Sequence, residues 1–151
     1  MKEISVHFHP SLKYLSTSAC KTILKIIFLK EKVPSYSLSV IFDSEDLLNN
    51  LKRQFFYKDH DTDVIAFRLN EYENKMVEGE IYICIPIALE NAKLYKENDN
   101  REISRLIIHG AFHLMGFEDG TDKEKKIMTQ KEDFYLNILE KNKIFLYEKT
   151  K

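Results

Sequence analysis

The sequence predicts an α/β (α+β) fold: a single-domain sandwich in which a small four-stranded mixed sheet packs against about five helices. The chain has 151 residues, and 44% of them are hydrophobic, which is enough to bury one core without disulfides. Segments with strand and helix periodicity follow one another in the order β-α-β-α-β-β-α-α-α, which is typical of a sheet covered by helices. No linker, repeat or low-complexity tract divides residues 1–151, so we expect one domain.

Strands are predicted where apolar side chains alternate with polar ones, or form short β-branched runs bounded by turn residues. In the first strand Ile4, Val6 and Phe8 share one face, and Pro10 ends the strand. The last two strands should pair antiparallel, because only a short charged turn, residues 71–78, separates them. The four predicted strands span residues 3–9, 36–42, 64–69 and 79–85.

Helices are predicted where apolar side chains recur at three- and four-residue spacing after a capping residue. Ser16 or Thr17 can cap the first helix. Thr121 and Glu124 form a capping box, in which each side chain satisfies the backbone donor of the other residue, at the start of the last helix. The five predicted helices span residues 16–30, 44–56, 86–97, 100–115 and 121–141.

Composition and charge exclude several classes of protein. The net charge is −1, which argues against a generally basic nucleic-acid binder but not against a local basic cleft. No apolar run reaches the ~20 residues that span a bilayer, and the first ten residues lack the apolar stretch of a secretory signal. Cys20 and Cys84 lie outside any metal motif, so we expect buried thiols in a reducing compartment. Together these features predict a cytoplasmic protein.

The chemistry of the chain is concentrated in residues 109–120, which read HGAFHLMGFEDG. His109 and His113 are four residues apart, so on a helix their imidazoles lie on one face, one turn apart. The apolar residues around them predict a mostly buried helix, in which two unpaired imidazoles would be costly. One divalent metal ion bound by both rings would remove that cost.

A third ligand is expected just after this helix. Gly116 can take the left-handed conformation that ends a helix, after which the chain can turn back toward the histidines. Asp119 is then placed to supply a carboxylate oxygen, and the adjacent Glu118 is the alternative. Three protein ligands leave one position for water or substrate, which is typical of catalytic zinc, and zinc lowers the pKa of bound water to about 7. The residues therefore predict a zinc-dependent hydrolase.

The same residues also allow a structural interpretation. Two helix histidines can be bonded to backbone or carboxylate groups, and Asp119 can be a turn residue or a helix cap. The motif is not the HExxH of zinc proteases, because Gly110 stands where their general base lies. That substitution argues against a metallopeptidase.

The stretch HGAFHLMGFED resembles the signature of the YbeY family of bacterial endoribonucleases, the rRNA maturation factors. In that signature the third metal ligand falls at the position of Asp119, where the usual residue is histidine. This register favours Asp119 over Glu118, so the metal ligands that the resemblance implies are His109, His113 and Asp119. The residues that match the signature directly are His109, Gly110, His113, Leu114 and Gly116.

Two further blocks extend the resemblance over nearly the whole chain. Residues 62–67, TDVIAF, and residues 79–83, GEIYI, are similar to two strands of the family, in the same order. Ala66 stands where the family strand has serine. The resemblance implies a mostly parallel four-stranded sheet with one antiparallel strand and with helices packed around it.

The resemblance also implies a function. It implies single-strand-specific cleavage of RNA, maturation of ribosomal RNA at the 3′ end of the small-subunit RNA, ribosome quality control, and the small ribosomal subunit with its proteins as partner. One departure concerns an arginine of the family, because Phe56 occupies its position and leaves Arg53 or Lys58 to supply a cation for phosphate. Glu80 is a further catalytic candidate, expected to orient water or a ligand.

Other interpretations and residues remain open from the sequence. The same metal could serve a metallopeptidase or a small-molecule hydrolase, or it could be structural in a non-catalytic ribosome-assembly factor. Arg101 and Arg105 lie about one turn apart on the predicted metal helix and are expected to border its cleft.

Overall fold

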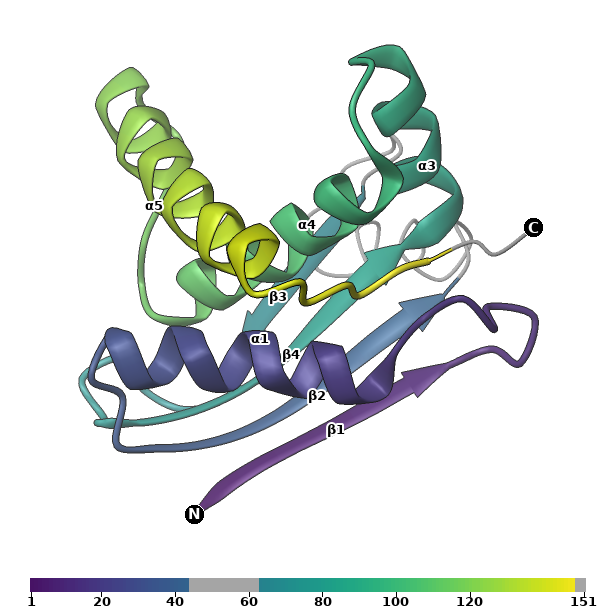
Figure 1. The fold of residues 1–151 in the computed structure, drawn as a ribbon. Helices are drawn as coiled ribbons and strands as arrows, with labels where there is room; N and C mark the ends of the chain where they lie inside the picture. The colour runs from purple at the N-terminus through teal and green to yellow at the C-terminus, as the bar shows by residue number, and fades with distance from the viewer. Residues whose placement is uncertain (44–62, 149–151) are drawn as a thin grey trace, which may run out of the picture.

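One sheet with helices packed on it makes up the computed structural model, which describes residues 1–43 and 63–148 (Figure 1). The strands are β1 (Lys2–Phe8), β2 (Ser35–Asp43), β3 (Val64–Arg68) and β4 (Met76–Cys84). The helices are α1 (Thr17–Lys30), α3 (Ile85–Leu94), α4 (Asp99–Leu114) and α5 (Asp122–Lys141). The predicted helix at residues 44–56 lies outside the described residues.

The sheet has the strand order β1-β2-β4-β3. β1, β2 and β4 are parallel, and β3 pairs antiparallel with β4. The parallel pair β1 and β2 needs a crossover, which α1 supplies after Ser16 caps its first turn. The predicted α/β class, with a mixed sheet and one antiparallel strand, is confirmed.

The two faces of the sheet differ in what covers them. In β2 the buried side chains alternate with partly exposed ones, and the register places Val40 beside Val6 and Ile81. This face carries the main core, which α1 and α4 complete from the same side (Figure 1). Residues of the opposite parity, such as Glu80 in β4, therefore point to the other face of the sheet.

The hairpin between β3 and β4 is tighter than the sequence predicts. β4 begins at Met76 rather than at residue 79, because asparagine side chains close the turn and let the pairing continue. The Asn70 side chain donates to the Met76 carbonyl at 2.8 Å and accepts from the Glu78 N–H at 3.1 Å. Asn74 accepts from the Met76 N–H at 3.0 Å. The predicted charged turn at residues 71–78 is thus too long by three residues.

The end of α3 is a second boundary that the sequence misplaces. The helix stops at Leu94 instead of residue 97. Lys96 takes a left-handed φ of 55°, and the Glu97 N–H donates back to the Ala92 carbonyl at 2.7 Å. This closure satisfies the free carbonyls of the last turn without a glycine.

Both cysteines are free and buried, as predicted. Burial raises the pKa of Cys20 to about 12, and the charge of Lys21 opposes this only in part. Among the described residues no helix is both long enough and apolar enough to cross a bilayer.

Gly79 allows the end of α4 to approach β4 closely, and this gives a stability prediction. A Cβ at residue 79 would lie 2.7 Å from Leu114 Cδ2 and 2.8 Å from the Phe67 carbonyl oxygen. We expect Gly79→Ala to lower the free energy of unfolding by about 1–3 kcal/mol through overpacking, measured by urea denaturation. Gly120→Ala is the control, because the nearest side-chain atom to its Cβ would be Glu124 Oε1 at 3.9 Å, and we expect it to change stability by under about 0.5 kcal/mol. Equal losses would contradict this account.

Candidate metal centre

Helix α4 carries both histidines of the predicted site. Asn98 caps the helix by accepting from the Arg101 N–H at 3.1 Å, and Asp99 and Glu102 place negative charge near its positive end. His109 and His113 are partly buried one turn apart, with their ring centroids separated by 4.5 Å. Their Nε2 atoms face each other at 2.9 Å. The predicted helix and its shared histidine face are confirmed.

The bend after α4 returns the chain to the histidines. Gly116 takes a φ of 97°, its N–H donates to the His113 carbonyl at 3.0 Å, and the Phe117 N–H donates to the Phe112 carbonyl at 3.0 Å. The rings of Phe112 and Phe117 pack edge-to-face with centroids 5.0 Å apart. These two hydrogen bonds and the apolar contact define a Schellman closure, which requires the left-handed residue that glycine supplies.

Asp119 completes a three-residue cluster. Its Oδ2 lies 3.2 Å from His109 Nε2 and 3.5 Å from His113 Nε2. Ligand atoms that lie about 2.0–2.1 Å from a tetrahedral zinc ion are roughly 3.3 Å from one another. The distances that join His109 Nε2, His113 Nε2 and Asp119 Oδ2 are close to this value. These distances and the donor types fit one small divalent ion. Among the residues that the structure describes, this is the one group of three such side chains that could hold a metal ion. Glu118, the alternative ligand, is not part of it.

Glu132 of α5 supports the cluster, and the sequence analysis missed it. His109 Nδ1 donates to Glu132 Oε2 at 2.6 Å. In a neutral imidazole this proton position leaves the Nε2 lone pair free for a metal, and metal-binding histidines are commonly held in this way. The signal in the sequence is an acid within the apolar stripe of the last helix, since Met128, Tyr135 and Leu136 are its buried neighbours.

Both arginines of α4 are already bound to acids. Arg105 contacts Glu102 and Glu132. Burial alone would lower the pKa of Arg105, but the hydrogen bonds and charge of Glu102, and then those of Glu132, raise it above its ordinary value. Arg101 pairs with a different set of acids, Glu97, Asp133 and Glu140. Both arginines that the sequence places beside the predicted cleft are therefore engaged by carboxylates.

Glu80, a further predicted site residue, is not brought to the cluster. Glu80 lies on the face of the sheet opposite α4, where its Oε1 accepts from the Tyr82 hydroxyl at 3.3 Å. The neighbouring Ile81 takes the inner face, against Gly110 of α4. Arg53 and Lys58, together with Phe56, lie outside the described residues.

Position 110 has no room for the general base of a zinc protease. A Cβ on Gly110 would lie 2.8 Å from Ile81 Cγ2, a side chain with no exposed surface. A glutamate here would point into the sheet instead of toward the ion. The geometry therefore supports the sequence argument against a metallopeptidase.

A second residue that the sequence did not mark, Arg68 at the end of β3, anchors the end of the metal helix. Its Nη1 donates to the Leu114 carbonyl at 2.7 Å, and its Nη2 donates to the Met76 carbonyl at 3.0 Å. A cation at the carboxyl end of a helix is favourable, and here it also joins that end to the β3–β4 hairpin. No periodicity or spacing in the sequence points to this contact.

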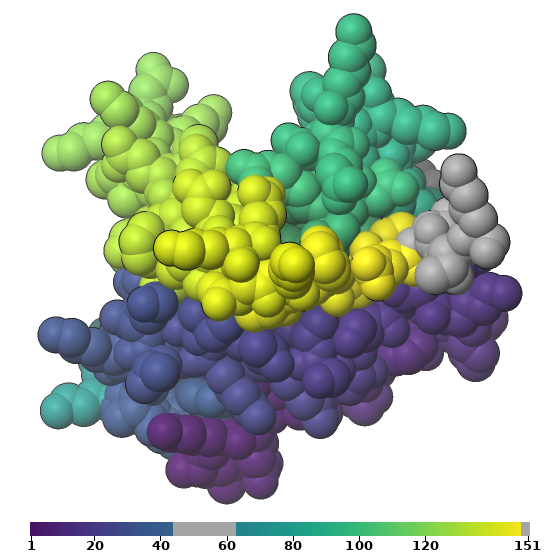
Figure 2. Space-filling view, in the orientation of Figure 1, coloured from purple at the N-terminus to yellow at the C-terminus, as the bar shows by residue number. Residues whose placement is uncertain are grey.

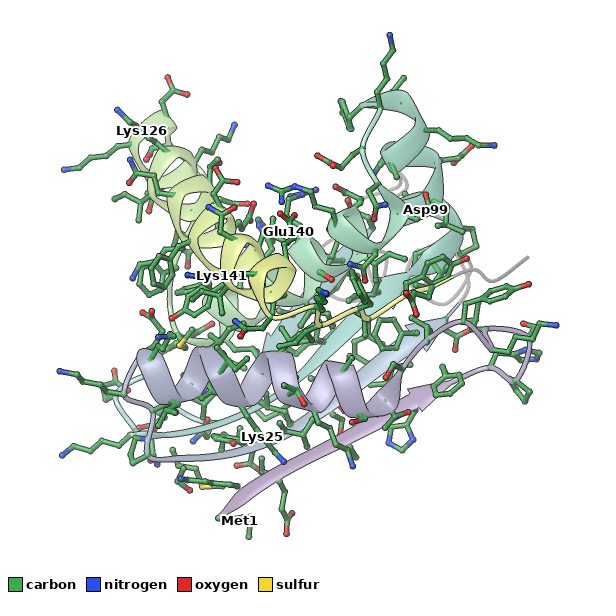
Figure 3. All side chains as sticks on the ribbon, in the orientation of Figure 1. Met1, Lys25, Asp99, Lys126, Glu140 and Lys141 are labelled. Carbon is green, nitrogen blue, oxygen red and sulfur yellow. The ribbon has the colours of Figure 1, made fainter. Side chains whose placement is uncertain are left out.

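The face of the molecule drawn in Figure 2 has a notch between α3 and α5. In Figure 2 the amino-terminal half of α5 and the far end of α3 project as two separate lobes, and α4 crosses the base of the notch between them. In Figure 3 Glu140 lies on the side of α5 that faces α4, consistent with its ion pair to Arg101.

Comparisons with known proteins place this geometry in a family. The family model described as "Endoribonuclease YbeY" matches residues 8–140. An endoribonuclease YbeY from Cytophaga hutchinsonii is 38% identical over 118 residues, covering 78% of this chain and 82% of the relative. One from Thermotoga neapolitana is 34% identical over 132 residues, covering 83% and 86%.

A solved structure is similar to this chain in both fold and sequence. The solution structure of a Thermotoga maritima protein superposes with a TM-score of 0.64 at 28% identity, over 93% of this chain and 91% of that one. The region that the family model matches, residues 8–140, includes helix α4, the bend after it and Glu132. The chain belongs to the endoribonuclease YbeY family.

Proposed function

We propose that this chain is a zinc-dependent endoribonuclease that cleaves single-stranded RNA. We further propose that it acts in the cytoplasm on ribosomal RNA, at the 3′ end of the small-subunit RNA and in ribosome quality control, with the small ribosomal subunit and its proteins as partner. The observation that carries the proposal is the convergence of His109, His113 and Asp119 on one point in a member of this family.

The side chains of the cluster each have a defined task in this proposal. His109 and His113 would hold the ion through Nε2, and Asp119 would hold it through a carboxylate oxygen. A divalent ion bound there supplies Lewis acidity toward a phosphodiester oxygen or a water molecule. Three protein donors leave at least one ligand position for substrate or water. Glu132 keeps the His109 ring oriented through its 2.6 Å contact.

The cation that binds the RNA phosphate comes from outside the described residues in this proposal. Arg101 and Arg105 are both engaged by carboxylates, so neither serves this purpose. We propose Arg53, with Lys58 as the alternative, because a fixed positive charge near the cleavage point stabilises the charge that develops on phosphate. Glu80 is not proposed, because it lies on the far face of the sheet.

Metal content tests the cluster directly. We expect the purified protein to retain about one zinc ion per chain after gel filtration, measured by elemental analysis. His113→Ala removes one of three ligands and should lower zinc affinity more than the ~10–100-fold loss typical of outer-shell changes. His7→Ala is the matched control, because His7 lies exposed on β1. Equal zinc retention in both variants would refute the assignment.

Cleavage tests the activity. We expect the zinc-loaded protein to cut single-stranded RNA in preference to duplex RNA of the same sequence, and chelation or His113→Ala to abolish most of this cleavage while His7→Ala retains it. Gel analysis of end-labelled RNA measures both effects. Cleavage that survives in His113→Ala would exclude this site as its source.

The cellular role has a separate test. Sequencing of small-subunit rRNA 3′ ends from cells that carry His113→Ala should reveal unprocessed ends, with His7→Ala cells as control. Normal ends in the His113→Ala cells would contradict the processing role. If the variant also still binds the small subunit, that result would favour an assembly factor with a structural metal.

A further inference from the structure

We propose that Arg105 is a positioning residue for the metal site. With Glu102 it holds the Glu132 carboxylate in the orientation that directs one oxygen at His109 Nδ1, so that the His109 Nε2 lone pair faces the other ligands. This inference rests on the proposed metal at His109, His113 and Asp119. It assigns a task to a buried ion network that would otherwise be only structural.

The first link fixes the guanidinium plane. Glu102, Arg105 and His109 are three and four residues apart, so they follow one another along one face of α4. Arg105 Nε donates to Glu102 Oε1 at 3.0 Å, and Arg105 Nη2 donates to Glu102 Oε2 at 2.6 Å. Two parallel hydrogen bonds between planar groups hold the guanidinium in one orientation, which a single contact would not do.

The second link fixes the carboxylate of Glu132. Arg105 Nη1 contacts Glu132 Oε1 at 3.4 Å, while His109 Nδ1 donates to Glu132 Oε2 at 2.6 Å. Each oxygen therefore has its own partner, and both partners stand on α4. Rotation of the carboxylate would break one contact or the other. The ring of His109 is thus tied to the backbone of α4 both through its own Cβ and through Glu132 and Arg105.

Because the two carboxylates in these contacts are buried, loss of a partner would be costly. Glu102 and Glu132 are each 4% exposed, and they are the two buried acids among the described residues. A buried carboxylate needs a charged or hydrogen-bonding partner. Without Arg105 the Glu132 Oε1 atom would lack its only cationic contact among the described residues, and the carboxylate could turn away from His109.

Arg101 provides the comparison that isolates this role. It also stands on α4 and also reaches α5, through Asp133 and Glu140. It contacts neither Glu132 nor a histidine. Both arginines therefore join α4 to α5 through ion pairs. Of the two, Arg105 is the one that contacts Glu132, the partner of His109.

The experiment compares Arg105→Lys with Arg101→Lys. Lysine keeps the charge, so folding is preserved, but it lacks the planar fork that can serve both acids. We expect Arg105→Lys to weaken zinc binding by about 10-fold and Arg105→Met by up to about 100-fold, within the range for lost outer-shell partners. We expect Arg101→Lys and Arg101→Met to stay within about twofold of the parent. Chelator competition measures the zinc affinities, and circular dichroism confirms the folded state.

A second readout does not depend on metal. In the metal-free protein, long-range ¹H–¹⁵N NMR spectra report which ring nitrogen of His109 carries the proton. Because Asp119 Oδ2 lies 3.2 Å from His109 Nε2, the diagnostic signal is a proton on Nδ1, with or without a second proton on Nε2. We expect the parent and the Arg101 variants to show this Nδ1 proton in full, and the Arg105 variants to show it only in part. An unchanged His109 spectrum in both Arg105 variants, or an equal change in the Arg101 variants, would overturn the inference. A parent protein that holds no zinc would instead overturn the proposed function, and the spectra would still decide the role of Arg105.

Discussion

The hydrogen-bonded closure at the end of α4 is the constraint on which the site depends. A helix alone can align His109 and His113, but it cannot supply a third donor to the same point. The left-handed φ of Gly116 reverses the chain within a few residues, and the Phe112–Phe117 contact holds that reversal against the core. Asp119 consequently reaches both imidazoles without any long-range pairing of its own. Loss of the closure would leave two ligands and a free loop.

The sheet fixes the position of the helix that carries this closure. Gly79 and Gly110 remove two side chains from the interface, so that Leu114 and Ile81 fill the space. Arg68 then binds the Leu114 carbonyl. Close packing on the sheet side leaves the histidine side of α4 to face α5, and this is why a residue of α5 completes the support of His109. Packing and chemistry thus use opposite faces of one helix.

Features that depend on local periodicity could be predicted from the sequence, whereas those that depend on tertiary contacts could not. The histidine pair, the Gly116 bend and the Thr121 capping box follow from spacings of two to four residues. Glu132 lies 23 residues from His109, and only the packing of α5 on α4 brings them together. The position of Glu80 at a predicted strand start marks it as a candidate, but side chains of β4 alternate between the two faces of the sheet, and that of Glu80 points away from α4. The register of the family signature separates Asp119 from Glu118, which spacing alone does not do, because the two acids are adjacent in the sequence.

The charges around the cluster balance when a divalent ion is included. Asp119, Glu102 and Glu132 are acidic, and Arg105 is the single basic group in contact with them in this network. With neutral imidazoles the network carries two more negative than positive charges, which is costly in a partly buried site unless a cation is present. A divalent ion would offset this excess without leaving a net positive charge. Attraction of an RNA phosphate would then arise from direct coordination and from a separate cation, and not from the overall charge of the centre.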